Sequence, residues 1–129
     1  MKRIILSLGV LMVLSQNIFA TSDAEYDKLI ANAKTEQIKQ GHRCDKATLN
    51  HKYTSDVNIC LKALELDLKA NASKSYIAID YLNSGVLYKY HEKNYIKAYE
   101  YYMKSAKLGD TDAQRNLDNL CRAHSWACK

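Results

Sequence analysis

The sequence predicts an all-α fold on two observations. Apolar residues recur every three or four positions in several stretches beyond residue 21, which is the spacing of one face of a helix. The 129 residues include no proline and only four glycines, so sharp β-turns should be few. We therefore expect helices joined by short connections.

The first twenty residues are typical of an export signal. Lys2 and Arg3 form a charged start, residues 4–13 form an apolar run, and Ala20 ends a suitable cleavage site. The apolar run is shorter than a membrane span requires, although an uncleaved anchor is the alternative interpretation. We expect a signal peptide over residues 1–20 and a periplasmic or secreted protein that is not stably inserted in the membrane after cleavage.

Residues 21–129 have the length of a single domain. Two of the 19 basic residues belong to the signal, which leaves 17 basic against 14 acidic residues in the domain. These basic residues are spread along the chain, whereas a nucleic-acid interface needs them clustered. We therefore expect no nucleic-acid partner.

The first part of the domain gives the weaker helical signal. Ser22 and Glu25 have the spacing of a capping box, in which each side chain caps the other's backbone N–H. They open an N-terminal helix expected over 22–40, which Gly41 should close. The periodicity is poor after this glycine, and only a short helix at about 45–52 is expected.

Four stronger helices follow, with capping residues in front of three of them. Their expected spans are about 55–70, opened by Ser55 and Asp56; 73–90, opened by Ser73 or Ser75; 95–108; and 111–123, opened by Asp110 or Thr111.

The junction between the last two helices carries the most specific pattern. Small residues such as Ala98 and Ser105 alternate with tyrosines, and Gly109 stands where a helix end must adopt a left-handed conformation. Residues 95–117 resemble the Sel-one-like repeat, a relative of the tetratricopeptide repeat. That family reads roughly K-A-x-x-Y-Y-x-K-A-A-x-x-G, followed by x-x-A-Q-x-N-L on the next helix.

An internal repeat extends this resemblance along the chain. A shift of 35 residues places Ala63 over Ala98, Ala78 over Ala113 and Leu82 over Leu117. The resemblance implies a short α-solenoid of antiparallel helix pairs. Its expected parts are the N-terminal helix (22–40), a degenerate repeat (43–70), a clear repeat (74–108) and a truncated repeat with the tail (111–129). The sequence departs from the family at Asn83 and Asp118, where a glycine is usual, and in the short connection 91–94.

Four cysteines in an exported domain indicate disulfides. Of the three possible connectivities, Cys44–Cys60 with Cys121–Cys128 is favoured, because each pair then bridges one connection between helices. Seven residues of unbroken helix rise about 10.5 Å, whereas a disulfide tolerates Cα separations of only about 7 Å. The last helix must therefore break near His124. Exported cysteine-rich members of the resembling family also join their repeats by disulfides, at other positions.

A zinc site is the alternative reading of the cysteines. It would use further donors from the histidines, which fall at expected helix ends: His42, His51 and His124. The spacing matches no compact structural zinc site, so no metal is expected.

No catalytic constellation is recognisable. The sequence offers no Ser/His/Asp set and no paired carboxylates, and Asp80 stands alone in an apolar helix face. We therefore expect no enzyme and no cofactor. The helical-repeat resemblance implies a protein-binding module, either an adaptor in an envelope complex or an immunity protein that neutralises a toxin. The alternative is a weak hydrolase related to cysteine-rich Sel-one-like proteins that bind β-lactams.

The expected binding surface is a groove lined by the first helix of each repeat. If Ala78, Leu82, Gly85 and Val86 face inward, a polar strip with one exposed leucine lies on the opposite arc. Its residues are Asp80, Asn83, Ser84 and Leu87, with Arg115, Asp118 and Asn119 on the next first helix. The alternatives are a plain solvated surface, on which Asp80 and Arg115 pair, or a groove on the second-helix face at Lys97 and Lys104.

Overall fold

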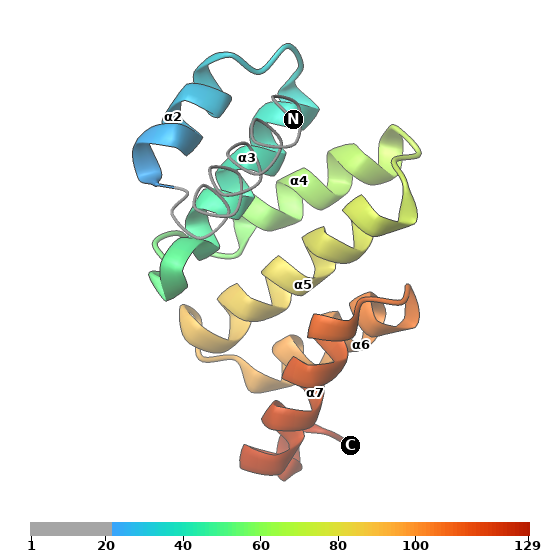
Figure 1. Cartoon of the computed structure of the whole chain (residues 1–129). Coiled ribbons are helices and arrows are strands. Elements are labelled where there is room, and N and C mark those ends of the chain that lie inside the picture. The colour runs from blue at the N-terminus through green and yellow to red at the C-terminus, as the bar shows by residue number, and fades with distance from the viewer. Residues whose placement is uncertain (1–21) are drawn as a thin grey trace, which may run out of the picture.

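The computed structural model describes residues 22–129, and the expected signal peptide lies outside them (Figure 1). This part of the chain folds into α-helices and two short 3₁₀-helices, with no β-strand. The α-helices are α2 (Asp23–Ala31), α3 (Glu36–Thr48), α4 (Asn58–Lys69), α5 (Lys74–Tyr90), α6 (Tyr95–Lys107) and α7 (Thr111–Ala123); the 3₁₀-helices are η1 (Leu49–His51) and η2 (Ser125–Ala127). The prediction of an all-α fold is confirmed.

Each α-helix packs against the next one in the chain, and α3 also packs against α5. Figure 1 shows the resulting order, with α2 and α3 at one end, α4 and α5 in the middle, and α6 and α7 at the other end. A shift of 35 residues places α4 over α6 and α5 over α7 to within three residues at either end. None of the helices between residues 22 and 129 is long and apolar enough to cross a membrane.

The N-terminal part differs from the sequence prediction. The expected helix over 22–40 is two helices, because Thr35 starts a new one by accepting a hydrogen bond from the Ile38 N–H at 3.2 Å. Gly41 does not end a helix but lies inside α3, and the short helix expected at 45–52 is the end of α3 followed by η1. The hydrophobic pattern did not predict α3, because the buried residues of this helix are Gln40, Cys44 and Ala47 rather than large apolar residues.

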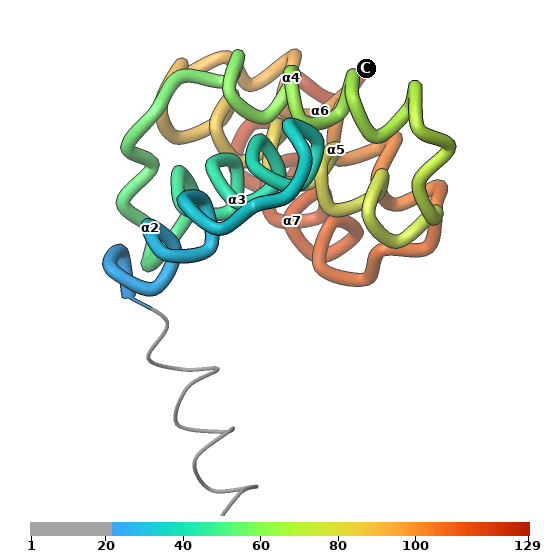
Figure 2. Tube along the Cα trace, turned by 90° about the horizontal axis from the view of Figure 1, so that it is seen from above, coloured from blue at the N-terminus to red at the C-terminus, as the bar shows by residue number. Residues whose placement is uncertain are grey.

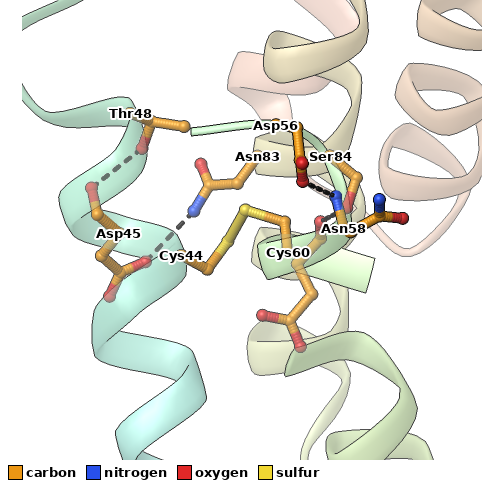
Figure 3. Close-up of a disulfide and its surroundings, with 9 residues drawn as sticks. Cys44, Asp45, Thr48, Asp56, Asn58, Cys60, Asn83 and Ser84 are labelled. Carbon is orange, nitrogen blue, oxygen red and sulfur yellow. Dashed lines mark hydrogen bonds between the residues drawn. A yellow bond between two sulfur atoms is a disulfide. The ribbon is translucent and has the colours of Figure 1, made fainter. Parts of the chain in front are cut away.

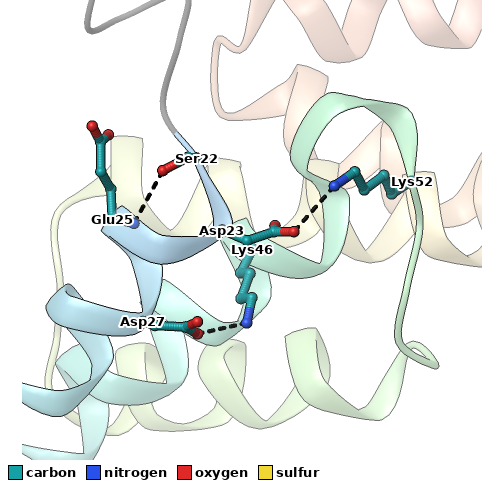
Figure 4. Close-up of polar contacts among 6 residues, drawn as sticks. All are labelled: Ser22, Asp23, Glu25, Asp27, Lys46 and Lys52. Carbon is teal, nitrogen blue, oxygen red and sulfur yellow. Dashed lines mark hydrogen bonds and ion pairs between the residues drawn. The ribbon is translucent and has the colours of Figure 1, made fainter.

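Helix α2 is held at the outside of the array. It contributes no buried residue, and Figure 2 shows it at the edge of the molecule beside α3. Ser22 caps it as predicted, accepting from the Glu25 N–H, and two exposed ion pairs tie it to the following segment (Figure 4). These join Lys46 to Asp27 at 2.6 Å and Lys52 to Asp23 at 3.0 Å. Exposed pairs of this kind contribute little to stability.

Both predicted disulfides are confirmed. Cys44 on α3 bonds Cys60 on α4 with a Cα separation of 4.7 Å, and both residues are fully buried (Figure 3). Cys121 bonds Cys128 with a Cα separation of 5.6 Å. The helix break required for this second bond is present, since α7 ends at Ala123 and the chain turns at His124. The zinc interpretation is wrong, because all four cysteines are in disulfides.

Helices α5 and α6 approach each other closely. Gly85 on α5 faces the ring of Tyr102, which is 1% exposed, and Ser105 on α6 donates a hydrogen bond to the Ala78 carbonyl at 2.7 Å. A Cβ atom at Gly85 would lie 2.6 and 2.7 Å from two ring carbons of Tyr102. A glycine is therefore required here by packing.

We expect Gly85→Ala to lower the free energy of unfolding by about 1–3 kcal/mol, because a fully buried ring has to move. Gly41→Ala is the matched control: it is also inside a helix, but no atom lies within 4 Å of its added Cβ. That variant should gain up to about 1 kcal/mol from helix propensity. Urea denaturation of both variants measures the difference, and equal stabilities would contradict the tight contact with Tyr102.

Candidate binding pocket

A pocket of about 440 Å³ lies where α3, α4 and α5 meet. This volume falls in the range of roughly 300–1,000 Å³ that is usual for ligand sites. The residues that line it are Gln37, Ile38, Gly41, His42 and Asp45 from α3, Asp67 from α4, and Tyr76, Ile79 and Asp80 from α5.

Three carboxyl groups, one from each helix, give the pocket its polar character. Asp45 accepts a hydrogen bond from the Asn83 amide at 3.1 Å (Figure 3), and Asp67 accepts one from the Gln37 amide at 2.6 Å. Asp80 is only 5% exposed, and its Oδ2 atom has no hydrogen-bond partner among the described residues. The acid that is buried most deeply is therefore also the one left unsatisfied.

The surroundings of these carboxyls raise two pKa values. Burial raises the pKa of Asp80 to about 9, helped by a hydrogen bond with Asp67 and by the negative charges of Asp67 and Asp45. Burial also raises the pKa of Asp45 to about 6, against the opposing influence of His42 and of the Asn83 hydrogen bond. At neutral pH, Asp80 thus keeps its proton and can donate it to Asp67.

The rim of the pocket is apolar. Ile38, Tyr76 and Ile79 are 44%, 64% and 39% exposed, although all three are large hydrophobic side chains. An exposed apolar rim around a few polar groups is the usual composition of a binding site. The pocket therefore combines surface that favours burial with carboxyls that favour a charged or hydrogen-bonding ligand.

A group of aromatic residues with one exposed ring lies at the C-terminal end. Tyr95 stacks on His124 with ring centroids 4.0 Å apart, and Trp126, which is 57% exposed, meets both rings edge-on. No buried acid accompanies these rings.

The surface predicted from the sequence is not the exposed strip that we expected. Asp80, Ser84 and Leu87 are buried, and Leu87 packs in the core with Cys44 and Cys60. The physical reason is that α5 is covered from two directions, by α3 and α4 on one side and by α6 on the other. The arc assumed to face solvent faces these helices, and the leucine proposed as a contact is a core residue.

The remaining residues of that predicted set divide into two groups. Asn83 is partly buried and binds the Asp45 carboxylate. Arg115, Asp118 and Asn119 are exposed on α7, and Arg115 pairs with Asp112 at 3.0 Å rather than with Asp80. Of the predicted set, the α7 residues are the ones that lie on exposed surface.

The sequence reading missed the pocket because its acids are far apart in the chain. The expectation that Asp80 has no acidic neighbour is wrong: Asp67 and Asp45 line the same pocket, and their charges raise the pKa of Asp80. One signal was present, since Asp67 also lies in a mostly apolar helix, between Leu66 and Leu68. Acids that interrupt apolar stretches on neighbouring helices indicate a shared polar site.

The described residues show no arrangement suited to a metal ion. Among residues 22–129, no group of three or more His, Cys, Asp or Glu side chains has an arrangement that could hold a metal ion. The polar character of the pocket therefore comes from its hydrogen-bonding and charged groups.

In comparisons with known proteins, no family model, no curated protein and no solved structure matches the chain.

Proposed function

We propose that this protein is an exported protein-binding module, and that its partner docks on the rim of the pocket between α3, α4 and α5. The observation that carries the proposal is the exposure of Ile38, Tyr76 and Ile79 around a pocket that contains three carboxyls, one of them buried. Aromatic residues beside a concave site are frequent centres of binding energy between proteins. The partner is an envelope protein or a toxin, and the role is accordingly that of an adaptor or of an immunity protein.

The export and the architecture belong to the same proposal. Two disulfides are typical of an oxidising compartment, which supports a periplasmic or secreted location. The 35-residue register of α4 with α6 and of α5 with α7 supports a short solenoid of antiparallel pairs, of Sel-one or tetratricopeptide-like type. A rigid array of this kind presents a fixed surface to a partner.

Binding is better supported than hydrolysis. The residues that line the pocket include no serine, threonine or cysteine that could serve as a nucleophile for a β-lactam. A toxin gene next to the gene for this protein would favour the immunity role, whereas genes for envelope assembly would favour the adaptor role.

Tyr76→Ala and Ile79→Glu should each weaken binding of the partner by at least about tenfold, because they remove apolar contact area at the rim. Both side chains are exposed, so the melting temperature should change little. The measurement is affinity capture from a cell-envelope extract with the disulfides kept oxidised, followed by titration of the captured partner. Trp126→Ala, an equally exposed aromatic residue at the other end, is the control. Normal capture by both rim variants would overturn the assignment of the surface.

A further inference from the structure

Among residues 22–129, no lysine or arginine forms an ion pair with the acids of the pocket. The charged and titratable groups that line it are His42 and Asp45 from α3, Asp67 from α4, and Tyr76 and Asp80 from α5, with no lysine or arginine among them. The ion pairs of residues 22–129 all lie elsewhere and involve none of the three aspartates. The buried Oδ2 of Asp80 has no hydrogen-bond partner in the described part of the chain. A cationic ligand would supply what the fold leaves out.

The shape and composition of the pocket favour a guanidinium group over a simple ammonium. A guanidinium carries five N–H donors in a flat fork and can bind two carboxyls from different directions, whereas an ammonium has three donors on a point charge. The acceptors here come from three different helices. Tyr76 and the two isoleucines of the rim can cover the aliphatic stem and stack against the flat group.

We propose that the pocket binds an arginine side chain of the protein partner, with the guanidinium between Asp80, Asp67 and Asp45 and the stem against Ile38, Tyr76 and Ile79. This inference rests on the proposed function, since it names the chemistry by which the partner is held. Charge complementarity selects the occupant, because the pocket holds three carboxyls, of which Asp80 is buried, inside an apolar rim.

Binding of a cation should be coupled to proton release. Without a ligand, Asp80 holds a proton at neutral pH because its pKa is raised to about 9. A guanidinium beside it favours the ionised form and lowers that pKa, so the proton leaves when the ligand binds. His42, Asp45, Asp67 and Tyr76 line the same space. The affinity should therefore rise with pH between about 6 and 9.

The test uses N-acetyl-L-arginine methylamide as the probe, titrated into the purified exported protein and followed by amide NMR shifts. The neutral isostere N-acetyl-L-citrulline methylamide is the ligand control. The corresponding lysine derivative tests whether the pocket prefers a guanidinium group to an ammonium group. We expect saturable shifts at Asp45, Asp67 and Asp80 with arginine, weaker binding with lysine and none with citrulline. The affinity for arginine should increase by up to about tenfold per pH unit, since one proton is released.

Asp80→Asn preserves the shape of the side chain but cannot release a proton and become charged, so it should weaken arginine binding by at least about tenfold. Asp118→Asn, an exposed acid on α7, should bind the probe like the wild type. Equal binding of arginine and citrulline, tighter binding of lysine than of arginine, or undiminished binding by Asp80→Asn would each overturn the proposal.

Capture of the partner separates this inference from the broader function. If Asp80→Asn retains the partner while Ile79→Glu loses it, the rim is the interface but the arginine assignment is wrong. If both variants retain the partner, the proposed surface and the arginine site fail together. Loss of the partner by both variants, with arginine bound only when Asp80 is present, supports both.

Discussion

Replacing Cys44 and Cys60 together with alanine is expected to lower the free energy of unfolding by about 3 kcal/mol under oxidising conditions. The bond joins residues 16 apart, and opening it restores the freedom of that loop in the unfolded chain. The loop also has a conformation that side chains rarely adopt, since Asn50, His51 and Tyr53 all have positive φ values between 48° and 58°. The disulfide holds together the two helices that this strained connection joins.

The matched control is the pair Cys121→Ala and Cys128→Ala. That bond joins residues only seven positions apart at the end of the chain. Its removal should therefore lower the free energy of unfolding by less, and it should loosen only the residues nearby. Denaturation by urea measures the global effect of each pair, and hydrogen exchange shows where protection is lost. The expectation for Cys44 and Cys60 fails if their removal leaves the stability unchanged, or if it loosens only residues 49–57.

The sequence predicted the second half of the fold better than the first, for a physical reason. From residue 55 onward the helices bury large apolar residues, and recognisable residues mark where helices end and begin. Gly109, with φ 98°, follows the end of α6, and Asp110 is the N-cap of α7. In α3 the buried positions are Gln40, Cys44 and Ala47, which give no hydrophobic period. Cys44 is buried against Cys60 of α4, a residue from another helix. The spacing of apolar residues within α3 alone therefore could not predict this helix.

The site was less predictable than the fold. A helical wheel of α5 shows which residues share a face, but it cannot say which faces are covered by other helices. Leu87 and Asp80 were assigned to solvent, yet contact with α3 and α4 buries both. The pocket depends on three helices whose acids lie 22 and 13 positions apart in the chain, at residues 45, 67 and 80. Only the tertiary arrangement brings them together.

Asp80→Asn is expected to raise the free energy of unfolding at pH 7 by about 2–4 kcal/mol. In the folded protein, burial and the neighbouring acids raise the pKa of Asp80 from 3.8 to about 9, so the folded state disfavours the ionised form. An aspartate in the unfolded chain has lost its proton at pH 7. Folding must therefore take up a proton or bury a charge, and asparagine requires neither.

The same pKa shift fixes how this gain depends on pH. Between about pH 4 and 9 the folded protein binds more protons than the unfolded chain, so the stability of the wild type falls as the pH rises. Asp45, with a pKa of about 6, adds to this slope at the acidic end only. Asp80→Asn should thus match the wild type near pH 4 and exceed it increasingly up to about pH 9.

Urea denaturation at pH 4, 5.5, 7 and 8.5, with Asp118→Asn as the exposed control, measures this difference directly. If Asp80→Asn raises the free energy of unfolding by the same amount at every pH, then Asp80 does not take up a proton when the protein folds. The stabilising variant is also the one expected to lose arginine binding. A buried acid that weakens the fold yet is needed for a ligand is the usual signature of a functional site, because binding requires an unsatisfied group that folding alone would remove.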